Sequence, residues 1–152
     1  MKRTILLEVL SALFATLFVY TGTNKILEHR SFVFDLGRDP MIGTSLASFA
    51  SLAVPAVEIL VATLLLIPKT QKIGIVSTVV LMTCFTIYVR LMLHSPVRHC
   101  TCGGVLRQMT WTQHLYFNVC FTILSLVALL LCYSKEEKPY HLSGNPESHS
   151  TN

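Results

Sequence analysis

The stretch TSLASFASLAVPAVEILVATLLLI, residues 44–67, decides the fold of this chain. It carries a single charged side chain, that of Glu58. A helix needs about 20 mostly apolar residues to cross the hydrocarbon core of a bilayer. Residues 44–67 are therefore predicted to span a membrane.

Three further runs have a similar length and composition, at residues 4–21, 73–93 and 113–133. The chain of 152 residues is 52% hydrophobic and 13% charged, whereas charged residues make up about a quarter of a typical soluble domain. The four runs leave no segment long enough for a soluble catalytic domain. We predict an all-α fold, an integral membrane four-helix bundle over residues 1–133, followed by a disordered polar tail over residues 134–152.

The first run resembles a secretory signal peptide only in its basic start, Lys2 and Arg3. Glu8 interrupts the apolar stretch, and no small-x-small cleavage site follows it. We therefore expect a retained helix, which can continue through Leu27. The segment 22–43 that follows is predicted to be a polar loop with a helical start.

The basic residues do not decide the orientation, because each side of the membrane receives six of them. On the side of the termini lie Lys2, Arg3, Lys69, Lys72, Lys135 and Lys138; on the other side lie Lys25, Arg30, Arg38, Arg90, Arg98 and Arg107. The tight turn 69–72 favours cytoplasmic termini. The loop between the third and fourth spans then faces outward, into an oxidising compartment. Basic residues facing anionic lipid account for the net charge of +4, so no nucleic-acid partner is expected.

Polar and small residues recur at helical spacing within three of the spans. The stripes are Glu8, Ser11, Ala15, Phe18, Gly22 and Lys25; Ser48, Ser51, Pro55, Glu58 and Ala62; and His114, Asn118, Thr122 and Ser125. Such residues face other helices, because hydrocarbon offers no hydrogen-bond partner and small side chains permit close approach. Thr110, with Gln113 three residues later, predicts a capping box at the start of the fourth span.

Two cysteines, Cys100 and Cys102, lie one residue apart in the loop before the fourth span. The basic side chains of Arg98, His99 and Arg107 favour the reactive thiolate, and a bridge across one intervening residue is strained and easily reduced. We interpret the pair as a thiol–disulfide redox site. The alternatives are a structural or inert pair, or metal ligands completed by histidines. The histidines available for that role are His94, His99 and His114.

Glu58 is the second candidate site residue, because an acid in the middle of a span is costly and must find a partner. It is a candidate proton relay for the thiol chemistry; the alternative is a neutral acid that ties helices together. Lys25 is a candidate for electrostatic support of that chemistry, as is His99, whereas a purely structural Lys25 would extend to the headgroups.

The chain is similar to the MauE/DoxX group of small bacterial four-helix membrane proteins from Thr4 to Tyr133. The motifs that carry the resemblance are Tyr20-Thr-Gly-Thr-Asn-Lys25, Pro55-Ala-Val-Glu58, and Cys100-Thr-Cys-Gly-Gly104 followed by Trp111 and Asn118. The resemblance implies a redox-associated protein of the bacterial inner membrane. MauE-like members are linked to the maturation of methylamine dehydrogenase, whose small subunit is dense in disulfides, and DoxX-like members to quinone or thiosulfate oxidation. Many relatives carry glycine where this chain has Thr101, which stiffens the link between the thiols.

The sequence thus predicts a membrane protein in which Cys100 and Cys102 exchange a disulfide with an exported thiol protein or a thioredoxin-like partner. A membrane quinone is the candidate electron acceptor. Two other classes stay open. One is a non-catalytic membrane scaffold with structural cysteines, and the other is a metal-handling membrane protein.

Overall fold

The computed structural model describes residues 2–38, 42–93 and 110–134. Its elements in chain order are α1 (Lys2–Leu27), α2 (His29–Arg38), α3 (Gly43–Leu66), α4 (Gln71–Met92) and α5 (Trp111–Tyr133). All regular structure in these ranges is helical. By length and composition, α1, α3, α4 and α5 are able to cross a membrane. The predicted all-α membrane bundle is confirmed.

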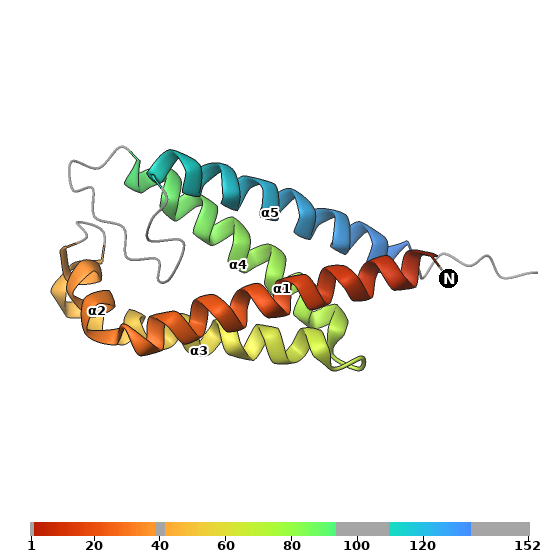
Figure 1. The fold of residues 1–152 in the computed structure, drawn as a ribbon, viewed down its shortest axis with the longest axis horizontal. Coiled ribbons are helices and arrows are strands. Elements are labelled where there is room, and N and C mark those ends of the chain that lie inside the picture. The colour runs from red at the N-terminus through yellow and green to blue at the C-terminus, as the bar shows by residue number, and fades with distance from the viewer. Residues whose placement is uncertain (1, 39–41, 94–109, 135–152) are drawn as a thin grey trace, which may run out of the picture.

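The four long helices run in alternating directions (Figure 1). α1 packs mainly against α3, and α4 packs against both α3 and α5. α1 and α5 converge where α1 begins and diverge toward the end of the bundle that carries α2 (Figure 1). We call these two ends the N-terminal end and the α2 end. α4 finishes and α5 begins at the α2 end.

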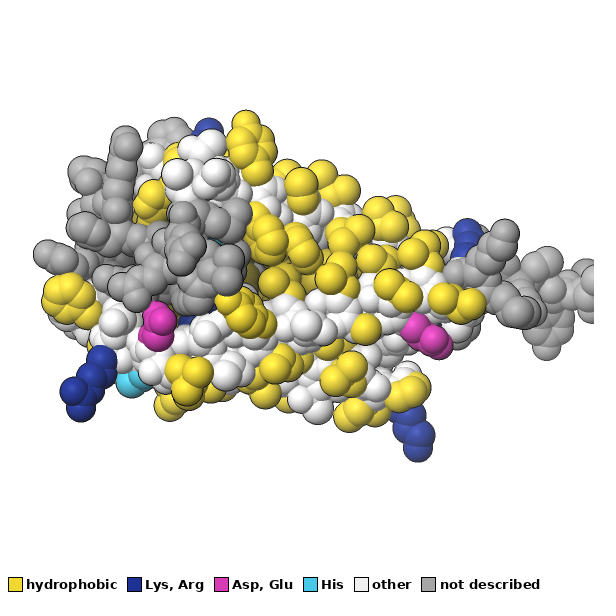
Figure 2. Space-filling model, viewed as in Figure 1, with side chains coloured by type: hydrophobic (Ala, Val, Ile, Leu, Met, Phe, Trp, Pro, Cys, Tyr) yellow, Lys and Arg dark blue, Asp and Glu magenta, His cyan; other side chains and the backbone are white. Residues whose placement is uncertain are grey.

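The core is apolar in the half of the bundle where α1 and α5 meet. Leu7, Leu10 and Phe14 of α1 pack there with Ala128 and Cys132 of α5. Outside this core, hydrophobic side chains cover the long side of the bundle, and the charged side chains seen on this face lie toward its two ends (Figure 2). This distribution fits a protein surrounded by lipid between two polar surfaces.

α2 corrects the predicted loop over residues 22–43. Phe32 and Leu36, one helical turn apart, are buried against Ala47 of α3. Helical hydrogen bonding also continues across the junction with α1, since the Glu28 amide donates to the Asn24 carbonyl at 2.9 Å and the Phe32 amide donates to the Glu28 carbonyl at 3.0 Å. Because the segment is mostly polar, its apolar face of two residues was not predicted.

The start of α5 has the capping box that the sequence predicts. The Thr110 hydroxyl accepts from the Gln113 amide at 3.3 Å, and the Gln113 side chain accepts from the Thr110 amide at 2.9 Å. These reciprocal bonds satisfy two amides that the first helical turn leaves unpaired. They fix the point at which the chain re-enters the bundle at the α2 end.

The α3–α4 turn at the N-terminal end depends on a glycine. A Cβ atom on Gly74 would lie 2.9 Å from both the Leu64 carbonyl carbon and the Leu65 amide nitrogen. The Thr70 hydroxyl closes the same turn by donating to the Leu64 carbonyl at 3.0 Å. The absence of a side chain at Gly74 therefore lets α4 lie directly against the backbone of α3.

Candidate functional site

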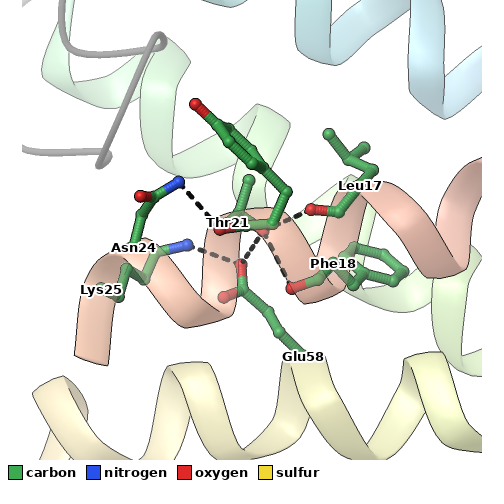
Figure 3. A network of polar contacts seen from close by, with 7 residues as sticks. Leu17, Phe18, Thr21, Asn24, Lys25 and Glu58 are labelled. Carbon is green, nitrogen blue, oxygen red and sulfur yellow. Dashed lines mark hydrogen bonds and ion pairs between the residues drawn. The ribbon is translucent and has the colours of Figure 1, made fainter. Parts of the chain in front are cut away.

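A buried ion pair joins α1 to α3 inside the bundle. The Lys25 ammonium lies 2.6 Å from Oε1 of Glu58. Only 7% of the Lys25 surface is exposed, and Glu58 is fully buried. Figure 3 shows the two side chains extending toward each other across the space between the helices. Lys25 is therefore directed into the protein and not toward the headgroups.

The antiparallel arrangement of α1 and α3 explains how these residues meet. Side chains on a helix lean toward the N-terminus of that helix. Lys25 lies in the last turn of α1 and leans back into the bundle, whereas Glu58 lies well inside α3 and leans toward the α2 end. The long lysine stem spans the remaining separation along the bundle axis.

The two carboxylate oxygens of Glu58 have different surroundings. Oε1 accepts from Lys25 and lies 3.2 Å from the Thr21 hydroxyl, which also lies 3.0 Å from the Leu17 carbonyl. Since a hydroxyl has one hydrogen, Thr21 donates to one of these acceptors at a time. Oε2 is buried and has no hydrogen-bond partner among the described residues. One oxygen of the acid is thus held and the other is not.

Two further neighbours complete the surroundings of the pair. The Lys25 ammonium lies 5.4 Å from the centroid of the Phe85 ring of α4, within the range of a cation–π contact. Gly22 lets α1 approach α3 beside the acid, because a Cβ atom there would lie 3.2 Å from Ile59 Cδ1 and 3.4 Å from Glu58 Oε2. Three helices therefore enclose the ion pair.

The polar stripes face inward, with two exceptions. The buried members are Ser11, Ala15, Phe18, Gly22, Lys25, Ser51, Pro55, Glu58, Ala62, His114, Asn118 and Ser125, and Thr122 is partly buried. Glu8 and Ser48 are exposed at the helix surface. The stripe on α5 begins at the α2 end, where the His114 ring stacks on Trp111 and the Asn118 side chain donates to the His114 carbonyl at 2.9 Å.

The predicted redox residues lie outside the described ranges. The segment 94–109 contains Cys100, Cys102 and His99. The structure describes the residues on either side of it, Leu93 and Thr110. Both flanking residues lie at the α2 end, the end toward which Lys25 is placed on α1. Of the predicted site residues, the structure brings together Lys25 and Glu58.

The helix cysteines have unequal surroundings. Cys84 and Cys120 are exposed on the outside of the bundle, whereas Cys132 is buried in the apolar core. Within the described ranges, no three His, Cys, Asp or Glu side chains are grouped so as to hold a metal ion. Of the three histidines considered as ligands, the structure describes His114 only.

Sequence reasoning missed Thr21 and Phe85 as parts of the site. Thr21 had a detectable signal, because it lies one helical turn before Lys25. Phe85 had none, since one aromatic residue within an apolar span is indistinguishable from a lipid-facing one. Its role depends on how α4 is rotated against α1, which the pattern of α4 does not specify.

Comparison with known families gives one match. The model described as methylamine utilisation protein MauE matches residues 3–131, a range that includes α1 to α4 and nearly all of α5. No curated protein and no solved structure matches the chain. The match thus covers the bundle and both residues of the buried ion pair.

Proposed function

The chain belongs to the MauE family of methylamine utilisation proteins, and on that premise we propose that it is a membrane thiol–disulfide exchange protein that supports the maturation of an exported partner. The family and the four apolar helices fit a multi-pass membrane protein in methylamine utilisation. The thiol chemistry is the part proposed here. It rests on Cys100 and Cys102 in the sequence and on the buried pair in the structure.

The proposed location is the bacterial inner membrane, with both termini in the cytoplasm. Four spans return the chain to its starting side, and the segment holding Cys100 and Cys102 then faces the oxidising compartment. An exported protein with unpaired cysteines, or a thioredoxin-like carrier, meets the pair there. Lipid contacts the exposed apolar side chains of the long helices.

The proposed exchange conserves atoms and electrons. A thiolate of the partner attacks the Cys100–Cys102 disulfide and forms a mixed disulfide, which the second partner thiolate resolves. The partner loses two electrons and two protons and becomes a disulfide, while Cys100 and Cys102 gain them and become thiols. A two-electron membrane acceptor of the quinone class then takes two electrons and two protons from the dithiol.

The observation that carries the proposal is the buried Lys25–Glu58 pair with one carboxylate oxygen unpartnered among the described residues. A thiol must lose its proton before it attacks, and an adjacent base accelerates that step. Lys25 holds one carboxylate oxygen of Glu58, and the other oxygen is left to accept a proton. Lys25 lies in the last turn of α1, toward the α2 end, and at that end α4 finishes and α5 begins. His99, which directly precedes Cys100 in the sequence, is proposed to support the thiol chemistry electrostatically.

A single-turnover assay in lipid nanodiscs tests this function. Oxidised protein is mixed with a reduced peptide that contains two cysteines. We expect the peptide mass to fall by two hydrogens as Cys100 and Cys102 become alkylatable. The double variant Cys100→Ser/Cys102→Ser should abolish the reaction. The control Cys84→Ala/Cys120→Ala removes two thiols on the outer surface of the bundle and should keep the rate within about twofold.

Three results would count against exchange. If the peptide is oxidised equally fast by the Cys100→Ser/Cys102→Ser variant, these residues are not the redox pair. If that variant fails to accumulate in membranes, whereas the Cys84→Ala/Cys120→Ala control accumulates normally, the cysteines are structural and the scaffold function is favoured. Stoichiometric zinc or copper in purified protein, lost in the same variant, would instead show metal handling.

A further inference from the structure

We infer that Glu58 accepts its proton on Oε2 and from the α2 end of the bundle alone, because an apolar layer seals it from the N-terminal end. The inference rests on the proposed function for the need to accept a proton. The structure supplies the receiving atom and the side of access. The species that Glu58 takes up is a proton, which water delivers.

The division of donors between the two carboxylate oxygens identifies the receiving atom. Oε1 already has the Lys25 ammonium at 2.6 Å and the Thr21 hydroxyl at 3.2 Å. Oε2 has no donor in the described part of the chain and is buried. An incoming proton binds Oε2 without displacing a contact, whereas a proton on Oε1 would displace Lys25.

The side of access follows from the order of residues along α1. From the N-terminal end to the α2 end, its inward face presents Ser11, Phe14, Phe18, Thr21 and Lys25. Exposure on this face is highest at Lys25, at 7%, and falls to 1% at Phe18 and Phe14. Lys25 is also in the last turn of the helix. A path from Glu58 toward the α2 end therefore passes Lys25 and avoids the rings of Phe14 and Phe18.

Below the ion pair, each of the four long helices contributes an apolar side chain to one packed cluster. The rings of Phe14 and Phe18 have centroids 6.3 Å apart, and Phe14 meets Phe121 of α5 edge to face at 5.8 Å. Ala62 of α3 and Met82 of α4 are buried in the same cluster. Close-packed aromatic and aliphatic groups leave no hydrogen-bonding path for a proton.

A second set of hydroxyls lies on the far side of this layer, but it does not reopen a path. Ser11, Thr78 and Ser125 converge there, and the space between them is too narrow to hold a water molecule. The Thr78 hydroxyl donates to the Gly74 carbonyl at 2.8 Å, and the Ser125 hydroxyl donates to the Thr122 carbonyl at 2.7 Å. The hydrogens of Thr78 and Ser125 are thus committed to the backbone, and the Ser11 hydroxyl accepts from the Gln71 side chain at 3.1 Å.

A pair of threonine hydroxyls beside the layer bonds to itself and to the backbone. The hydroxyls of Thr86 and Thr122 are 2.8 Å apart, and each also lies 2.8 Å from a carbonyl of its own helix. Among the described residues, the buried titratable side chains are Lys25, Glu58, His114 and Cys132. Of these, only Cys132 lies on the N-terminal side of the apolar layer.

Proton flux into sealed proteoliposomes tests the seal without needing thiol activity. A potassium diffusion potential drives protons, a trapped dye reports the internal pH, and a protonophore added at the end shows that the vesicles respond. We expect wild type and Glu58→Gln to give the same flux as protein-free vesicles. A wild-type flux above that of Glu58→Gln would show a path through Glu58 across the bundle and would overturn the inference.

The rate of peptide oxidation tests the side of access. The buffer on each side of the same vesicles is changed separately, and the pH of only one side is varied at a time. The wild-type rate should follow the pH on the side of the α2 end, and this dependence should weaken in Glu58→Gln. A wild-type rate that follows the pH on the opposite side, with that dependence lost in Glu58→Gln, would overturn the inference. If no variant oxidises the peptide, the proposed function fails, and the flux measurement still decides the seal.

Discussion

Lys25 and Glu58 show how one polar contact can be sustained within an apolar bundle. Removing two charges from water is expensive, and their attraction offsets that cost only when the geometry is close. The separation of 2.6 Å and the Phe85 ring beside the ammonium meet that condition. The pair therefore contributes little net stability while it is intact, but each partner depends strongly on the other.

That dependence predicts an asymmetry between single and double substitutions. Lys25→Met leaves a buried carboxylate unpaired, so we expect it to lower the free energy of unfolding by about 3–5 kcal/mol. Lys25→Met/Glu58→Met replaces both charges by apolar groups and should recover to within about 1 kcal/mol of wild type. The loss of helical signal during a titration in mixed detergent measures the free energy of unfolding of both variants.

The single variant Glu58→Met completes the cycle of four proteins. If the stability losses of the two single variants simply add in the double variant, Lys25 and Glu58 do not act as a pair. A matched control is Thr16→Val, on the exposed face of α1, whose hydroxyl donates only to the Ala12 carbonyl of its own helix. It should leave stability unchanged.

At the scale of elements, glycines set how closely helices approach, and their surroundings differ. Gly74 of α4 lies against the backbone of α3, whereas Gly22 of α1 lies against the end of the flexible Ile59 side chain and a carboxylate oxygen. A side chain can rotate away from a new methyl group, but a helix backbone can yield only by moving the helix. The two positions should therefore respond differently to the same substitution.

We expect Gly74→Ala to be destabilising by about 1–3 kcal/mol, the usual cost of overpacking. Gly22→Ala should be near neutral, because the higher helix propensity of alanine, about 1 kcal/mol, offsets a small repacking. Thermal melts followed by circular dichroism compare the two variants directly. Equal melting temperatures would show that α4 can move away from α3 at no cost.

The elements also show where sequence reasoning succeeds and where it fails. Length and hydropathy were enough to predict four long helices, since both are set by the bilayer. α2 was missed because its buried face consists of Phe32 and Leu36 within a charged segment. The stripes predicted that Lys25 and Glu58 face inward, but they did not predict that the two residues meet. That pairing depends on which helix lies beside α1, and no residue of α1 specifies it.

At the scale of the whole molecule, the free thiols report the orientation. Cys84 and Cys120 face the surroundings of the membrane-spanning helices, and Cys132 is buried. A membrane-impermeant maleimide applied to intact, mildly reduced cells should therefore label only Cys100 and Cys102, if the segment between α4 and α5 faces outward. Mass analysis of the peptide that contains both residues measures the labelling. Labelling only in inverted membrane vesicles would place that segment in the cytoplasm and contradict the proposed topology.

The divergence of α1 from α5 has a consequence for the lipid around the protein. The two helices meet at the N-terminal end and separate toward the α2 end, where α2 adds further width. As viewed in Figure 1, the bundle is therefore wedge-shaped and wider at the α2 end than at the N-terminal end. If the four long helices span the bilayer, each leaflet must fill its own area, so we expect the wedge to displace more lipid from the leaflet at the α2 end. We therefore expect the protein to prefer membrane that bends away from that end over flat membrane.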